Sequence, residues 1–150
     1  SGTVLRSVYY RYNIYTTEYH IMQLSMHYTI DTEPERRVMV EKIYGTWDIA
    51  TARQYHEDFK EAAGPLVGKK WAKIVNLTSW KASHPDMIKI IGEHLKWCKD
   101  NGMVLSINII DNPITRRKMK KMFNIGGTGD VSRMVRDRSE AERLLTQNGF

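Results

Sequence analysis

Residues 103–110 read MVLSINII, an apolar run interrupted only by Ser106 and Asn108. A strand that is apolar on both faces is typical of a parallel sheet covered by helices on each side. Residues 71–77, WAKIVNL, have the same character and predict a second central strand. The two runs together predict an α/β fold.

The segments around these two strands alternate between strand and helix patterns. Further strands are expected over Leu24–Ile30, Arg37–Tyr44 and Val131–Val135, with a turn at 31–35. Helices are expected from Asp48 to Gly64-Pro65, from a capping box at 83–86 to Asn101-Gly102, from Pro113 to about Phe123, and from a second capping box at 139–142 to Asn148-Gly149. This order, β-β-α-β-α-β-α-β-α, predicts a mixed, mostly parallel sheet of four or five strands flanked by helices.

The chain shows no repeat and no Pro/Gly-rich linker, so we expect one domain over residues 23–150. Residues 1–22 are interpreted as an N-terminal extension because they fit no element of this pattern. They carry five tyrosines: Tyr9, Tyr10, Tyr12, Tyr15 and Tyr19. An extra strand or a contact between subunits would explain them, and a homodimer is one such contact.

Composition predicts a soluble cytoplasmic protein. No apolar run approaches the roughly 20 residues of a membrane span, and residues 1–19 do not resemble a secretory signal. The single cysteine, Cys98, fits a reducing compartment and lies in a helical apolar pattern, which predicts a buried thiol.

The formal net charge is +6, from 23 Lys and Arg against 17 Asp and Glu. A basic protein favours anionic partners: an acidic protein, a phosphate, an anionic membrane surface or a nucleic acid. Nucleic acid ranks lowest, because only Phe123 offers a stacking ring beside the main basic cluster.

No enzyme motif is present: the chain lacks GxGxxG, GxxxxGK(S/T), GxSxG, HExxH and CxxC. The five histidines do not pair at metal-ligand spacing and are interpreted as surface or helix-side residues. The GGTG stretch at 126–129 precedes a predicted strand rather than a helix, so it is interpreted as a flexible connection and not a phosphate cradle. We therefore expect no catalytic residue, metal or cofactor.

The strongest charge cluster lies on the predicted helix after Pro113. On a helical wheel its exposed arc collects four cations: Arg116, Arg117, Lys120 and Lys121. Ile114, Met119, Met122 and Phe123 occupy the opposite arc, with Lys118 among them and its stem extended outward. Either this arc is an ordinary solvated face or it is a docking surface for an anionic partner.

A second candidate site is the carboxyl edge of the parallel strands, where open α/β sheets bind ligands. The residues expected there are Asn76, Thr78, Ser79, Trp80, Ser83, Asp111 and Asn112. Ordinary turn and capping chemistry also accounts for Ser83, Asp111 and Asn112, so both interpretations stay open.

Four phrases resemble bacterial SpoIIAA-like proteins of the STAS superfamily: VMVEKIYGTWD at 38–48, WAKIVNLTSW at 71–80, SINIIDNP at 106–113 and SRMVRDRSEAERLL at 132–145. The resemblance spans residues 33–150 and implies a four- or five-stranded mixed sheet, related in topology to CRAL-TRIO lipid-binding folds. Relatives that antagonise anti-sigma factors carry a phosphorylatable serine in an Asp-Ser-Ser/Thr-Gly motif. Here that region reads KASHPD at 81–86, so the motif is missing and Ser83 is the nearest hydroxyl.

Two functions follow as hypotheses. The first is a non-enzymatic regulatory or protein-interaction module that uses the strand-end loops and the basic helix. The alternative is a carrier of a small lipid-like or anionic ligand, held between sheet and helices, whose basic helix faces a membrane.

Overall fold

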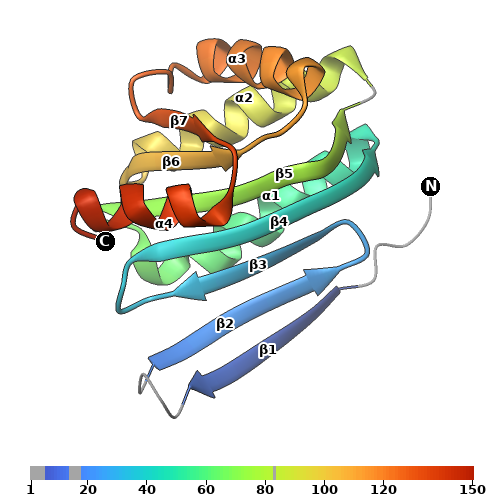
Figure 1. Cartoon of the computed structure of the whole chain (residues 1–150). Helices are drawn as coiled ribbons and strands as arrows, with labels where there is room; N and C mark the ends of the chain where they lie inside the picture. Colours follow the sequence, from blue (N-terminus) through green and yellow to red (C-terminus); the bar gives the residue numbers. More distant parts are fainter. Residues whose placement is uncertain (1–5, 14–17, 83) are drawn as a thin grey trace.

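A seven-stranded sheet forms the centre of the computed structural model, which describes residues 6–13, 18–82 and 84–150 (Figure 1). The strands lie in chain order across the sheet: β1 (Arg6–Asn13), β2 (Glu18–Ser25), β3 (Tyr28–Glu33), β4 (Val38–Trp47), β5 (Trp71–Ala82), β6 (Met103–Ile109) and β7 (Ser132–Val135). The helices are α1 (Ile49–Ala63), α2 (Pro85–Asp100), α3 (Pro113–Gly126) and α4 (Arg138–Gln147), with a short 3-10 helix at Gly64–Leu66.

The sheet is mixed. Strands β1 to β4 pair antiparallel, whereas β4 to β7 pair parallel, with one helix in each crossover. From β3 onward the element order matches the predicted one, which confirms the α/β class. Strands β1 and β2 extend the sheet beyond the four or five strands expected, and they include four of the five N-terminal tyrosines.

Helices cover both faces of the sheet. One core lies between the sheet and α1, α2 and α3; Phe59, Leu95 and Met122 are buried in it. A second, smaller core lies under α4, where Ala141 and Leu145 are buried. In the first half of β5, buried apolar residues alternate between the two cores, as the pleat of a central strand requires: Trp71 and Val75 lie in the larger core, and Ala72 and Ile74 in the smaller.

The predicted first strand over Leu24–Ile30 is wrong. The chain bends at Met26–His27, so this stretch belongs to two antiparallel strands, β2 and β3. The hydroxyl of Ser25 accepts hydrogen bonds from the backbone N–H of His27 at 3.0 Å and of Tyr28 at 3.1 Å. Serine hydroxyls stabilise turns in this way, and the apolar pattern alone did not reveal the turn.

Two predicted capping boxes are also wrong. The N-cap of α2 is His84, whose Nδ1 accepts from the N–H of Asp86 at 3.1 Å, and Ser83 lies outside the described residues. The N-cap of α4 is Asp137 rather than Ser139. By contrast Asp48 caps α1 as predicted, and its pKa is lowered by the hydrogen bond from the backbone of Thr51.

None of the helices in the described part of the chain combines the length and apolar composition needed to cross a membrane.

Candidate functional site

The candidate site depends on where β5 ends. The sequence places this end at Leu77, but β5 runs to Ala82 and stays paired with β4 beyond the end of β6. Asn76, Thr78, Ser79 and Trp80 therefore lie within the strand and not past it, which corrects the prediction. The pairing explains the error: past Asn76 the strand has lost its β6 neighbour, so polar residues such as Thr78 and Ser79 are exposed between buried Leu77 and Trp80.

These four residues do not form one site. Trp80 is buried and packs edge-on against Trp47, with ring centroids 5.6 Å apart. Asn76 uses its Oδ1 to accept from Thr78, both from the backbone N–H and from the hydroxyl. Trp80 thus contributes to packing, and Asn76 and Thr78 to local hydrogen bonding, while Ser79 is exposed.

The residues after β6 do lie at the carboxyl edge, as predicted. Asp111 and Asn112 are exposed between β6 and α3. Asn112 is the N-cap of α3: its Oδ1 accepts from Ile114 N–H at 2.8 Å and from Thr115 N–H at 3.3 Å. Because the N–H groups of Ile114 and Thr115 are bonded to Asn112, they are not free to bind an anion. Any attraction for an anion at this edge therefore has to come from side chains.

Helix α3 supplies that charge. Arg116, Arg117, Lys120 and Lys121 are all exposed, in agreement with the predicted cationic arc. Lys118 is half-buried, and its ammonium donates to the Ala82 carbonyl at 2.5 Å, which ties α3 to the end of β5. The predicted apolar arc holds for Met119, Met122 and Phe123, which are buried.

Ile114 departs from the prediction. Its side chain is 62% exposed, because Thr115 takes the inward position in the first turn of α3. Ile114 lines a hollow together with Lys81 and Lys118, so this edge presents a large exposed apolar side chain beside two cations.

Three hollows surround the first turns of α3. One of about 350 Å³ is lined by Thr46, Lys81, Ala82, Asn112, Ile114, Thr115 and Lys118. A neighbour of about 270 Å³ shares Ala82 and Lys118 with it, and a third of about 340 Å³ shares Asn112. We call these hollows, together with the exposed cations of α3, the basic edge: Lys81, Asn112, Ile114, Arg116, Arg117, Lys118, Lys120, Lys121 and Arg136.

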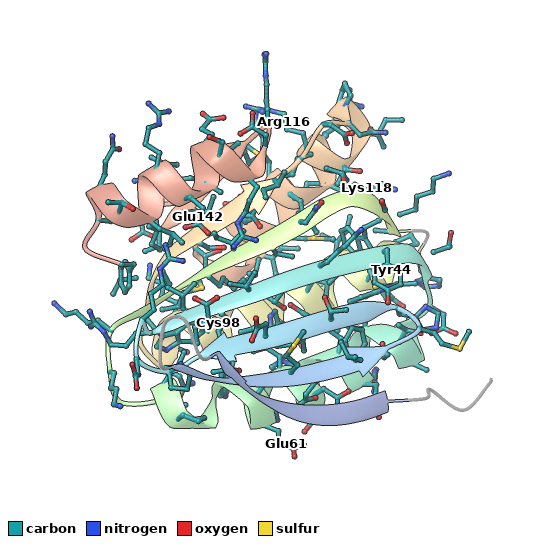
Figure 2. The ribbon with its side chains drawn as sticks, turned by 60° about the horizontal axis from the view of Figure 1, so that its bottom comes forward. Tyr44, Glu61, Cys98, Arg116, Lys118 and Glu142 are labelled. Carbon is teal, nitrogen blue, oxygen red and sulfur yellow. The ribbon has the colours of Figure 1, made fainter. Side chains whose placement is uncertain are left out.

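The cations of the basic edge have no carboxylate partners within the described ranges, whereas other cations of the chain do. Arg36, for example, contacts Glu142 at 2.5 Å, and Lys99 contacts Asp130 at 2.9 Å. Figure 2 shows Arg116 and Lys118 at the end of the molecule opposite Glu61 of α1. The basic edge therefore has an excess of positive charge, which the exposed carboxylate of Asp111 offsets only in part, and it attracts anionic groups.

A second polar site lies inside the larger core and was not predicted. It contains six residues, which we call the buried cluster: Glu41, Tyr55, His56, Lys73, His94 and Cys98. Lys73 Nζ lies 3.3 Å from a carboxylate oxygen of Glu41, and both side chains are almost completely buried. The Tyr55 hydroxyl donates to the other oxygen of Glu41. The predicted burial of Cys98 is confirmed.

Hydrogen-bond chemistry fixes the protons of the two histidines. Lys73 has only donors, so His94 Nε2, 3.4 Å away, accepts from it. The proton of neutral His94 is then on Nδ1, which donates to His56 Nδ1 at 2.8 Å. The chain of bonds thus runs from Glu41 in the core to half-buried His56. Both histidines lie on helices, as one of the two interpretations had it, but His94 is buried and not at the surface.

The buried cluster is unsuited to catalysis. Burial raises the pKa of the Cys98 thiol to about 12, so the nucleophilic thiolate is suppressed at neutral pH. Burial and the neighbouring Lys73 lower the pKa of His94 well below 6.5. The cavity beside these groups is about 20 Å³, space for one water and not for a substrate. Among the residues described, no group of three or more His, Cys, Asp or Glu side chains is arranged so that it could hold a metal ion.

Comparison with known proteins gives the fold its name. No protein-family model matches the sequence, and no curated protein matches it. Among solved structures, an uncharacterised DUF3478-family protein from Shewanella loihica PV-4, described as having a SpoIIAA-like fold, superposes with a TM-score of 0.56. The match covers 97% of each chain at 9% identity. This chain has the SpoIIAA-like fold.

A second match agrees with that assignment. The anti-sigma factor antagonist SpoIIAA in its unphosphorylated form superposes with a TM-score of 0.51 at 15% identity, over 75% of this chain and 90% of that one. At these identities the comparison shows the SpoIIAA-like fold alone. Function has to be argued from this chain's own surface.

Proposed function

We propose that this protein is a non-enzymatic docking module whose basic edge binds an acidic segment of a partner protein. The observation that carries the proposal is Ile114, which is 62% exposed beside a hollow of about 350 Å³ whose lining includes Lys81 and Lys118. An apolar anchor within a charged rim is the usual anatomy of a protein interface. The flanking cations favour an acidic partner and accelerate its association.

Packing argues against the alternative of a lipid carrier. A carrier needs an apolar cavity between sheet and helices, but the space there, lined by Trp80, Leu95 and Met119, is about 20 Å³. The hollows of the basic edge are open and shallow by comparison and lie outside the core. They suit side chains of a partner better than an acyl chain.

The partner can be captured by cross-linking through a photoreactive residue placed at Lys81, followed by mass spectrometry. The captured protein is then purified, and its binding is measured by calorimetry at several salt concentrations. We expect one-to-one binding that weakens as salt increases. Ile114→Asp should lower the affinity at least tenfold, and the double variant R117E/K121E should do the same.

Matched controls are available at the opposite end of β5. Val67 is an exposed aliphatic residue there, and Lys69 and Lys70 are exposed cations. V67D and K69E/K70E repeat the same changes of polarity and charge away from the basic edge, so both should bind like the wild type. Equal affinity of I114D, R117E/K121E and the wild type would exclude this surface.

A further inference from the structure

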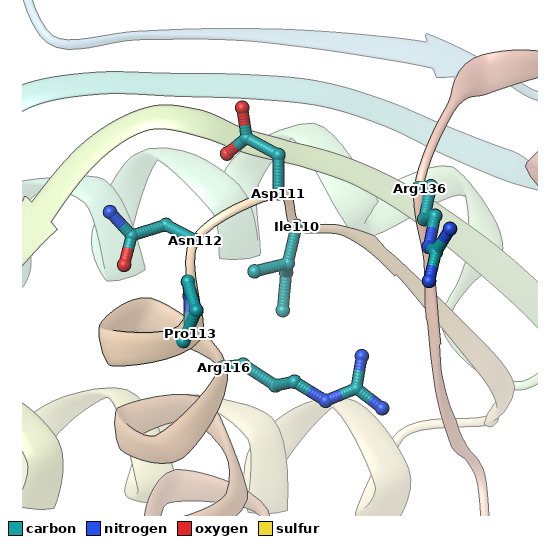
Figure 3. Close-up of a pocket in the computed structure, with 6 residues that line it drawn as sticks. All are labelled: Ile110, Asp111, Asn112, Pro113, Arg116 and Arg136. Carbon is teal, nitrogen blue, oxygen red and sulfur yellow. The ribbon is translucent and has the colours of Figure 1, made fainter.

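The hollow on the far side of Asn112 contains two arginines from different elements. Arg116 comes from α3 and Arg136 from the connection between β7 and α4, and both line the space of about 340 Å³. Figure 3 shows the two guanidinium groups extended toward each other across this space. Two like charges extended toward each other repel, and an anion placed between them would remove the repulsion.

The residues that line the hollow do not neutralise these two charges. Neither guanidinium has an ion pair among the residues described. Asp111 also lines the hollow, but its carboxylate extends away from both arginines (Figure 3). The remaining lining comes from Asn112, which caps α3, and from two apolar residues, Ile110 and Pro113.

We propose that this hollow, the arginine pocket, binds a phosphate monoester. Guanidinium groups bind phosphate through paired, parallel hydrogen bonds. Two of them match the charge of about −1.5 to −2 that a phosphate monoester carries at pH 7, whereas one carboxylate would leave the second arginine unneutralised. The space exceeds that of a bare phosphate, and Ile110 and Pro113 offer the attached group an apolar contact.

The phosphate can belong to a free small molecule or to a phosphorylated side chain of the partner. The chemistry at Arg116 and Arg136 is the same in both cases. The inference deepens the proposed function, because the arginine pocket is part of the basic edge. It can nevertheless be tested without any partner.

The test is an NMR titration of the ¹⁵N-labelled protein with inorganic phosphate, at constant ionic strength maintained with chloride. We expect saturable shifts confined to the backbone amides of residues 111, 112, 114–116 and 136. The double variant R116Q/R136Q should weaken phosphate binding at least tenfold. The matched variant K69Q/K70Q, which removes the same charge from exposed residues at the opposite end of β5, should change it less than threefold.

Shifts that do not saturate, or that weaken equally in both double variants, would overturn the arginine pocket. A second titration compares an acidic peptide containing phosphoserine with its serine counterpart and with inorganic phosphate. If the phosphopeptide binds at least tenfold tighter than inorganic phosphate, the phosphate belongs to the partner. Equal affinities of the phosphopeptide and inorganic phosphate assign the pocket to a free phosphate monoester.

The two proposals can fail separately. Loss of partner binding in R117E/K121E without phosphate binding in the wild type would retain the docking surface and remove the arginine pocket. Saturable phosphate binding that needs Arg116 and Arg136, with partner binding unaffected by I114D, would retain the arginine pocket and remove the docking surface.

Discussion

Gly126 of α3 lies directly against the backbone of Gly92 of α2: a Cβ built on Gly126 would be 2.5 Å from the Gly92 carbonyl oxygen. A Cβ on Gly92 would in turn lie 2.6 Å from the side chain of Ile125. The two helices approach this closely because neither residue has a side chain. This contact holds α3, and with it the basic edge, in place on α2.

Gly126→Ala should therefore destabilise the fold by about 1–3 kcal/mol, the usual cost of overpacking. Urea unfolding measures the change. Gly129→Ala is the control, since a Cβ there meets nothing within 4 Å and Gly129 does not have a positive φ. It should alter the free energy of unfolding by no more than about 0.5 kcal/mol. Equal effects of the two substitutions would contradict the close contact.

Acid should destabilise the protein through the buried cluster. Burial is the main cause that lowers the pKa of both His56 and His94 below the ordinary value of 6.5. The unfolded chain thus takes up protons at a pH where the folded protein does not. The stability that comes from the two neutral histidines is therefore fully present above pH 6.5 and is lost as the pH falls below that value.

Urea unfolding at pH 7.5 and 5.5 tests this dependence. His94→Gln should reduce the loss of stability between the two pH values, whereas His27→Gln, outside the cluster, should leave it unchanged. A wild type equally stable at both values would contradict the neutral, buried histidine pair.

The Glu41–Lys73 pair should show strong coupling. Lys73→Met leaves a buried carboxylate without its cation and should cost about 3–5 kcal/mol. E41L/K73M should cost less than the sum of the single changes, with a coupling energy of about 1–3 kcal/mol. The exposed pair Lys96–Asp100, at 2.5 Å, is the comparison, and its double-mutant cycle should give no more than about 1 kcal/mol. Similar coupling in both cycles would mean that Glu41 and Lys73 are not paired in a dry core.

Most strands and helices of the fold could be predicted from the local pattern of apolar and polar residues. The runs at 71–77 and 103–110 predicted the central strands, and the helix pattern from Asp48 to Gly64-Pro65 predicted α1. The errors arose where tertiary pairing or a single side chain decided the outcome. The hydroxyl of Ser25 turned the chain after β2, and pairing with β4 carried β5 on to Ala82.

The buried cluster was missed for a different reason. Its residues come from four elements, and no spacing rule connects Glu41 with His94. One signal was present: Lys73 stands inside WAKIVNL, in a strand predicted to be buried on both faces, where a lysine needs a partner. For the basic edge, the cations were predicted from the sequence. The outward position of Ile114 depends on where α3 begins, and this was seen only in the structure.

The two edges of the sheet have unequal lengths, and this limits how copies of the protein can assemble. Strand β1 has eight residues and β7 has four. Two copies joined through β1 would be related by a two-fold axis. In that arrangement the β1 edge of each copy is paired and no longer open to a third copy. A filament needs a second edge of comparable length, which β7 does not provide. Association through the sheet would therefore end at a closed pair.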